Sequence, residues 1–175
     1  MTIDDYRIAV GIPIHGDSPA FRATIDALAG ACRYANLRPD LIVTNSGPNA
    51  KSVDWPGELQ MLSLDGKKYW AGAVKAILST AKSAGYDFLI LMNHDCQPKQ
   101  DTIRELFSAA IEQPNAVVHA VLEYQEHPRK LWWSGSRIQR FRRLRYLPFR
   151  LLNSLPDSPL RTDSVMGQCL ILHKN

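Results

Sequence analysis

YDFLILMNHDCQP, residues Tyr86–Pro98, gives the strongest indication of the fold of this chain. The apolar run Phe88–Met92 is too short to span a membrane, and its central β-branched residue favours a strand buried on both faces of a parallel sheet. Two oxygen-bearing side chains, Asn93 and Asp95, follow this run, and Pro98 cannot continue a strand ladder. They are therefore expected at the carboxyl end of a central strand, where open α/β sheets bind ligands.

These two side chains allow two interpretations. A hard divalent cation that carries substrate phosphates needs one or two oxygen ligands of this kind from the protein. The alternative is that Asn93 and Asp95 only shape a turn and cap a helix that starts near Asp101. The rest of the chain bears on this choice.

The composition limits the class of protein. A chain of 175 residues, 45% hydrophobic and 22% charged, is typical of one globular domain. A formal charge of +4 allows an anionic ligand or membrane surface without requiring either. The three cysteines are far apart and are interpreted as reduced thiols of a cytoplasmic protein. The acidic start, MTIDDYRIAV, does not resemble a signal peptide, and no segment reaches the ~20 apolar residues of a membrane span.

Apolar runs alternate with helical periodicities, which predicts a mostly parallel sheet with helices on both faces. Strands are expected over Arg7–Ile14, Leu41–Thr44, Gln60–Leu64, Phe88–Met92 and Ala116–Leu122. A first helix is expected to be capped at Asp17 or Ser18, with Pro19 in its first turn, and to reach about Tyr34. A second helix is expected to end at Gly85 and a third before Pro114, the second burying Val74, Ile77, Leu78 and Ala81.

The last third of the chain has a different character. Arg137–Arg150 carries six arginines among aromatic and aliphatic residues, and the prolines within and after it exclude a long regular helix. Trp132–Gly135 is expected to form an edge strand or an aromatic-walled loop. Val165–Leu172 returns to an apolar strand.

Four sequence features stand in one order along the chain. They are VTNSGPN (Val43–Asn49), LDGKKYWAGAVKAIL (Leu64–Leu78), FLILMNHDCQP (Phe88–Pro98) and TDSVMGQCLIL (Thr162–Leu172). This arrangement resembles the nucleotide-sugar-dependent glycosyltransferases of family 2, and rhamnosyltransferase-like members acting on bacterial cell-surface polysaccharides are the most similar. The resemblance covers nearly the whole chain. It implies the GT-A fold, a three-layer α/β sandwich around a mostly parallel sheet, in a single domain over residues 1–175.

The resemblance implies that the nucleoside is bound at the ends of the first two strands. The family's first loop, which lines the nucleoside pocket, corresponds to Pro13, Ile14 and His15. The family's second strand ends in an acidic residue that contacts the nucleobase. That position corresponds to Thr44, followed by Asn45, so a hydroxyl stands where the family has a carboxylate and base selectivity is expected to differ.

A second set of donor-binding residues is implied at the start of the second helix. Asp65, Trp70, Gly72 and Lys75 match the family segment that packs beneath the ribose and diphosphate. Gly72 allows the backbone to approach a ligand closely, and a helix N-terminus favours phosphate. The alternative is that Trp70 and Gly72 are ordinary packing residues.

The resemblance also implies a metal site. Asn93, His94 and Asp95 match the family's motif of two acids around any residue, with asparagine in place of the first acid. Asp95, with Asn93, is the implied ligand of Mg²⁺ or Mn²⁺, which bridges the donor diphosphate and acts as a Lewis acid on the leaving group. His94 is expected to turn outward, and Cys96 is too soft a ligand for Mg²⁺.

The acceptor side is matched less closely and lacks a clear catalytic base. Trp133, Ser134 and Gly135 match a family segment near the acceptor; Asp163, Gly167 and Gln168 match the stretch beneath the donor sugar. In the family the general base follows the strand that Val165–Leu172 matches, where this sequence ends. We therefore expect a fragment lacking the acceptor part, or an incomplete enzyme that binds nucleoside diphosphate and cation but transfers sugar poorly. The remaining candidates for the base are Glu123, Glu126 and Asp163.

Three functions compete at this point. The first is transfer of a sugar from a nucleoside-diphosphate donor to a saccharide or lipid-linked acceptor, at the cytoplasmic side. The second is a non-catalytic nucleotide-sugar-binding protein. The third is a basic module in which Arg137–Arg150 binds nucleic acid or anionic lipid. Because the net charge is only +4, no nucleic acid is expected, whereas peripheral contact with an anionic membrane stays an open alternative.

Overall fold

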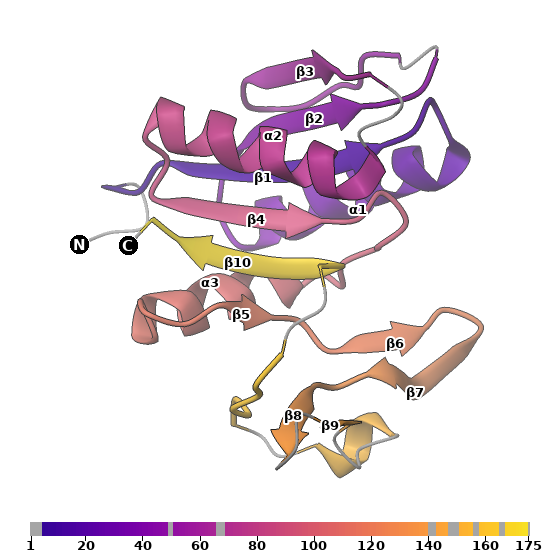
Figure 1. Ribbon diagram of the computed structural model, residues 1–175, viewed down its shortest axis with the longest axis vertical. Helices are drawn as coiled ribbons and strands as arrows, with labels where there is room; N and C mark the ends of the chain where they lie inside the picture. Colours follow the sequence, from indigo (N-terminus) through magenta and orange to yellow (C-terminus); the bar gives the residue numbers. More distant parts are fainter. Residues whose placement is uncertain are drawn as a thin grey trace.

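A six-stranded sheet forms the centre of the computed structural model, which describes residues 5–48, 51–65, 69–139, 143–146, 151–155, 158–164 and 167–174. The spatial order of its strands is β3 (Leu59–Ser63), β2 (Asp40–Asn45), β1 (Ile8–Ile14), β4 (Phe88–Met92), β10 (Cys169–His173) and β5 (Val118–His119). The first four of these are mutually parallel, whereas β10 is antiparallel to both β4 and β5. The carboxyl ends of the four parallel strands therefore share one edge of the sheet (Figure 1).

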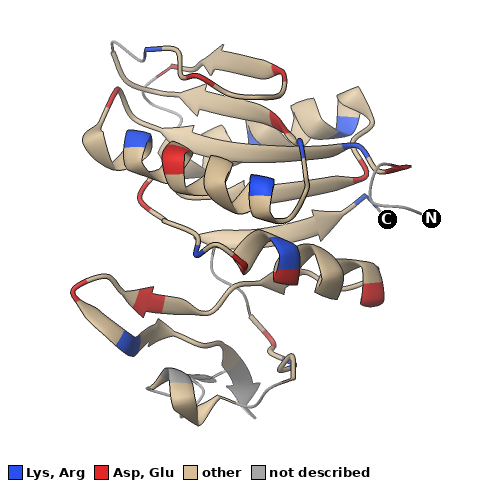
Figure 2. Ribbon diagram, turned by 180° about the vertical axis from the view of Figure 1, so that it is seen from behind, with Lys and Arg blue, Asp and Glu red and all other residues tan. Residues whose placement is uncertain are grey.

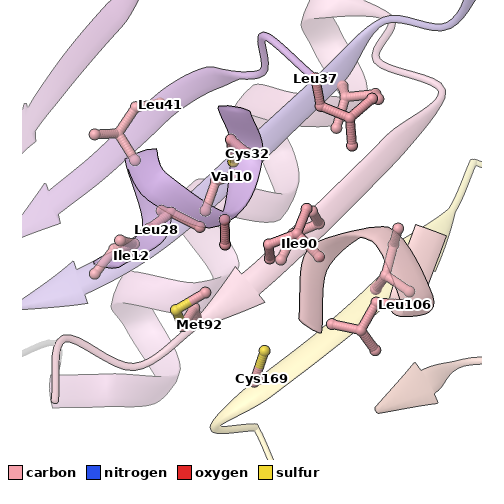
Figure 3. Packing of buried hydrophobic residues seen from close by; sticks show 14 of the residues in the cluster. Val10, Ile12, Leu28, Cys32, Leu37, Leu41, Ile90, Met92, Leu106 and Cys169 are labelled. Carbon is pink, nitrogen blue, oxygen red and sulfur yellow. The ribbon is translucent and has the colours of Figure 1, made fainter. Parts of the chain in front are cut away.

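Three helices cover the two faces of this sheet. α2 (Tyr69–Ala84) lies on one face, and α1 (Pro19–Tyr34) and α3 (Thr102–Glu112) lie on the other (Figure 1). Alternate residues of β1 face the two layers: Val10 packs with α1 and α3, and Ala9 packs with α2. The larger of the two cores lies beneath α1 and α3 (Figure 3). The predicted three-layer sandwich is confirmed.

The helix boundaries follow the predicted signals. Ser18 is the N-cap of α1, where its hydroxyl accepts a hydrogen bond of 3.1 Å from the backbone N–H of Phe21, and Pro19 occupies the first turn. Gly85 follows α2 with φ +74°, the left-handed conformation that suits a residue without Cβ. Both predicted caps are confirmed.

The predicted buried face of α2 is wrong at one position. Leu78 is 40% exposed, and the fully buried residues of this helix are Ala73, Ile77 and Ala81. The small residues let α2 lie close to β1, so close that a Cβ added to Gly11 would meet the Cγ2 atom of Ile77 at 2.3 Å.

The single strand predicted over Ala116–Leu122 is also wrong. The chain forms β5 and then, after two residues, β6 (Leu122–Tyr124), which pairs with β7 (His127–Trp133) in a separate two-stranded sheet. The backbone N–H of Ala120 still donates to the carbonyl of Cys169 at 3.0 Å, but β10 begins at that residue. Because β10 does not extend before Cys169, the residues that follow Ala120 have no partner on β10, and β6 pairs with β7 instead.

The remaining described segments lie beside this second sheet. β8 (Ser136–Gln139) and β9 (Arg143–Tyr146) form an antiparallel hairpin, followed by the short helix η3 (Leu152–Ser154). Part of Arg137–Arg150, and the first two residues of the strand predicted from Val165, lie outside the described residues.

Two further expectations can be compared with the structure. Within the described ranges, no helix combines the length and the apolar character needed to cross a bilayer. All three cysteines are free thiols, as predicted. Burial raises the pKa of Cys32 and of Cys169 to about 12, so both stay protonated.

Candidate functional site

The carboxyl edge of the parallel strands brings together most of the residues that the sequence singled out. Pro13 and Ile14 end β1 as buried residues, and the exposed His15 follows them. In the sheet register Pro13 pairs with Thr44 and Ile14 with Asn45. The two strands therefore end level with each other, and the loops that follow them are neighbours.

Asn45 binds these two loops together. Its Oδ1 accepts hydrogen bonds from the backbone N–H groups of Gly16 (2.8 Å) and Gly47 (3.0 Å), and its Nδ2 donates to the carbonyl of Gly47 (2.6 Å). A Cβ added to Gly47 would lie 2.5 Å from the nitrogen of Gly16, so only glycine allows this approach. Because its amide is occupied at both ends, Asn45 positions the loops.

A polar pair that the sequence did not indicate lies on the same loops. His15 Nδ1 is 3.1 Å from the hydroxyl oxygen of Ser46, and this hydroxyl donates to the carbonyl of Ile14 at 3.3 Å. In the sequence, Ser46 is one polar residue of a turn-forming run. Only the pairing of β1 with β2 places it beside His15.

Thr44 lies deeper than its predicted role requires. The residue is fully buried, and its Oγ1 has no hydrogen-bond partner among the described residues. It lies two residues after Ile42, which packs against α2, so strand alternation turns Thr44 toward the same layer. In this structure Thr44 offers no surface to a nucleobase.

Trp70 and Asn93 connect the start of α2 to the turn after β4. The indole Nε1 of Trp70 donates to Asn93 Oδ1 at 3.1 Å, although the indole is 49% exposed. A Cβ added to Gly167 would meet the indole at 2.6 and 2.7 Å, so the backbone leading into β10 lies directly against the ring. Trp70 therefore does more than pack, since it joins three elements at this edge.

The turn after β4 is held from both sides. The backbone N–H of Asn93 donates to the carbonyl of Gln168 at 2.9 Å, and its carbonyl accepts from the N–H of Cys96 at 3.2 Å. On the α1 side the hydroxyl of Thr24, fully buried, donates to the carbonyl of His94 at 2.8 Å. Asp95 remains exposed on this fixed turn.

The alternative that Asn93 and Asp95 cap a helix is wrong. α3 begins only at Thr102, its N-cap residue is Asp101, and that side chain makes no capping hydrogen bond. The amide of Asn93 is bonded to Trp70 instead.

The metal-binding capacity of this turn is small. The described part of the chain contains no group of three or more His, Cys, Asp or Glu side chains that could hold a metal ion. Burial, and secondarily the Asp95 carboxylate, raises the pKa of the Cys96 thiol to about 11, so it is no thiolate ligand. Asp95 is the carboxylate that the turn itself presents.

The sequence model described as Glycosyl transferase family 2 matches residues 9–167. The chain belongs to this family. No match is found among curated proteins.

Solved structures similar to this family 2 chain include the following two. S. aureus TarS 1–349 has a TM-score of 0.51 and 13% identity over 76% of this chain and 41% of TarS 1–349. A structure assigned as a nucleotide-diphospho-sugar transferase from Desulfovibrio desulfuricans G20 has a TM-score of 0.39 and 15% identity over 68% of this chain and 59% of its own. The chain therefore spans less than half of TarS 1–349. With the family match, the likeness to TarS 1–349 confirms the GT-A fold expected from the sequence, and at 13% identity that likeness concerns the fold alone.

Three residues that match the donor site of family 2, Asp65, Gly72 and Lys75, take no part in the contacts described above at the carboxyl edge of the sheet. Asp65 is exposed after β3, and Gly72 is half-buried in the first turns of α2. Lys75 is exposed, about 9 Å along the helix axis from Tyr69, at 1.5 Å per residue. Within the described parts of the chain, no hydrogen bond joins Gly72 or Lys75 to Asn93 or Asp95.

The acceptor-side match of this family 2 chain lies among buried and half-buried polar side chains. The Trp133 ring lies 4.5 Å from the ring of His119, whose Nε2 is 3.4 Å from the hydroxyl of Thr162. Ser134 and Ser136 are buried beside them, and Ser136 is hydrogen-bonded to Ser164. Ser136 and His119 were not identified from the sequence, because their significance depends on contacts between β5, β7 and the approach to β10.

One of the candidate bases is already paired. Glu123 forms an ion pair with Lys99 and also accepts the backbone N–H of Arg129 at 3.0 Å. The Lys99 hydrogen bond, and secondarily that backbone bond, hold the pKa of Glu123 below its usual value despite partial burial. A carboxylate stabilised in this way is a weak proton acceptor. Glu126 and Asp163 are exposed.

Proposed function

We propose that this domain binds a nucleoside-diphosphate sugar at the carboxyl edge of β1, β2 and β4 and serves in the transfer of that sugar to a saccharide or lipid-linked acceptor. The observation that carries this proposal is the Trp70–Asn93 hydrogen bond, which joins the start of α2 to the turn bearing Asp95 in a chain of family 2. The first turn of α2 contains no acidic residue, so its partial positive charge favours a phosphate.

The nucleoside is proposed to lie over the loops after β1 and β2. His15 and Ser46 supply polar groups there, at an edge whose shape depends on Asn45. The buried Thr44 would contribute to base selectivity only if a ligand displaces the residues that cover it.

The protein groups fit a cation that arrives with the diphosphate. Mg²⁺ bound together with substrate phosphates uses one or two carboxylates of the protein, and Asp95 supplies one. When bound, Mg²⁺ or Mn²⁺ would stabilise the charge that develops on the leaving nucleoside diphosphate. The protein's own part is to hold the Asp95 turn in place through the bonds to Gln168 and Thr24.

Thermal unfolding with UDP, dTDP and GDP, with and without Mn²⁺, tests this proposal. A ligand that binds only the folded protein raises the midpoint. We expect Asp95→Ala to abolish the Mn²⁺-dependent part of this rise. Asp101→Ala is the matched control, because Asp101 is an exposed aspartate of the same segment whose side chain makes no capping bond. Equal shifts for Asp95→Ala and the wild type would contradict the metal assignment.

Binding without transfer is the second candidate function, and the pairing of Glu123 with Lys99 favours it. General-base assistance ordinarily supplies about 10²–10⁴-fold in rate, so its loss would spare donor binding and slow transfer. Turnover of radiolabelled sugar nucleotides with saccharide and lipid-linked acceptors separates the two. Transfer at ordinary enzyme rates would exclude the second candidate.

A peripheral contact with an anionic membrane is proposed for the outward face of β7. Trp132 (44% exposed), Tyr124 (41%) and Leu151 (50%) lie at the surface, and the ammonium of Lys130 lies 5.5 Å from the centre of the Tyr124 ring. Aromatic rings and lysine are the side chains that favour a lipid interface. Acidic and basic positions are interleaved over the helices and loops, and the β6–β7 hairpin also carries both (Figure 2). Co-sedimentation with anionic but not neutral vesicles at low salt is expected; equal sedimentation would contradict the contact.

A further inference from the structure

Asn93 has four polar groups, and three of them are occupied within the protein. Its backbone N–H donates to Gln168, its backbone carbonyl accepts from Cys96, and its Oδ1 accepts the indole N–H of Trp70 at 3.1 Å. The side-chain nitrogen Nδ2 has no hydrogen-bond partner among the described residues. Asn93 is half-buried and this nitrogen is not fully buried, so the NH₂ group reaches the surface of the protein.

The orientation of this amide follows from the chemistry of its partner. An indole N–H can only donate a hydrogen bond, so the oxygen of the amide must face it. The reversed amide would set an N–H against an N–H and lose the bond. The backbone at Gly167 lies against the indole ring and limits the movement of the ring toward that side.

We propose that Asn93 binds an anionic oxygen of the donor diphosphate through its side-chain N–H groups and is not a ligand of the cation. This inference rests on the proposed donor site and reverses the role that the sequence suggested for Asn93. A carboxamide whose oxygen is occupied presents two donors, which suit a phosphate oxygen and repel a metal ion. The start of α2, which carries Trp70, adds partial positive charge on the same side. Asp95 is then the protein's carboxylate for the cation, two residues further along the turn.

Titration calorimetry with inorganic pyrophosphate and with UDP, each in EDTA and in Mn²⁺, tests the inference. The isosteric Asn93→Asp replaces the two donors by a carboxylate. We expect its affinity in EDTA to fall by about tenfold or more, the size expected for a hydrogen bond to a charged group. In Mn²⁺ its affinity should equal or exceed that of the wild type, because a second carboxylate then stands beside Asp95. Asn115→Asp is the matched control for charge, since Asn115 is exposed beyond the far end of α3.

Trp70→Phe is the second variant, because it keeps an aromatic ring and removes the N–H that orients the amide. Its affinity for pyrophosphate in EDTA should fall by about threefold or more, as a neutral hydrogen bond is lost and the amide is free to turn. In a ¹H–¹⁵N spectrum of the wild type, the Asn93 side-chain resonances should shift on adding pyrophosphate without metal.

The outcomes separate this inference from the proposed function. If Asn93→Asp and Asn115→Asp bind pyrophosphate in EDTA with affinities within about twofold of each other, Asn93 does not donate to the anion and the inference is overturned. It is also overturned if the wild type binds neither probe in EDTA. Binding of UDP that Mn²⁺ restores would then leave the proposed function standing, whereas absence of binding in both conditions would overturn both.

Discussion

Gly11→Ala is expected to force α2 away from the sheet. Gly11 lies in the middle of β1, paired with Ile42 on one side and Leu91 on the other. A Cβ at this position would lie 2.3 Å from Cγ2 of Ile77, a fully buried residue of α2. Carbon atoms ordinarily approach to about 3.5–4.0 Å, so the helix or the Ile77 side chain must move by about 1 Å.

The cost follows from the opposing effects of this substitution. Overpacking of a close-packed core typically costs about 1–3 kcal/mol. Alanine also lowers the conformational entropy of the unfolded chain, which stabilises the folded protein by about 0.4–1 kcal/mol where alanine can adopt the native backbone conformation. We therefore expect the free energy of unfolding to fall by about 1–2 kcal/mol. Displacement of α2 would also move Trp70, so diphosphate binding should weaken as well.

Urea unfolding of a double-mutant cycle measures this effect. Ile77→Leu removes the branch methyl that the new Cβ would meet, whereas Ile77→Val keeps it. The combination of Gly11→Ala with Ile77→Leu should therefore cost about 1 kcal/mol less than the two single changes together, and the combination with Ile77→Val should be additive. The reasoning fails if Gly11→Ala leaves the free energy of unfolding unchanged, or if both combinations are additive.

Three other predictions concern stability. Ser18→Ala should lower the free energy of unfolding by about 1 kcal/mol through loss of the α1 cap, with Ser18→Asp near wild type; equal loss in both would contradict the role of the cap. Trp55→Phe should cost about 1 kcal/mol in the same assay, because the 2.8 Å bond from the indole N–H to the carbonyl of Pro39 is lost in a buried site. Burial lowers the pKa of His119, so the folded protein resists a proton that the unfolded chain accepts. The free energy of unfolding should therefore fall as the pH is lowered through about 6.5, and it should fall less in His119→Gln. Parallel pH profiles of the wild type and His119→Gln would exclude His119 as the cause.

Local signals were sufficient for the helices and for the central strands. The apolar run of β4, the Ser18–Pro19 start of α1 and the glycine after α2 each act within a few residues, so they can be read from neighbouring positions. The exposure of Leu78 could not be predicted from neighbouring positions, because apolar periodicity does not reveal how closely a helix approaches the sheet. The distance between helix and sheet depends on the contact of Ile77 with Gly11, which is 66 residues before Ile77 in the chain.

The polar residues that end the strands can be recognised from the sequence alone, and with them the family and the edge of the sheet at which a ligand would bind. What each of these residues does depends on contacts that form only in the folded chain. Asn45 and Asn93 are the same residue type at the ends of two strands, yet the amide of Asn45 is occupied at both ends and the amide of Asn93 only at its oxygen. The difference arises from partners far away in the chain, the loop at Gly16 in one case and the indole of Trp70 in the other. Hydrogen-bond partners set the capacity of an amide to bind a ligand, and those partners are brought together only by folding.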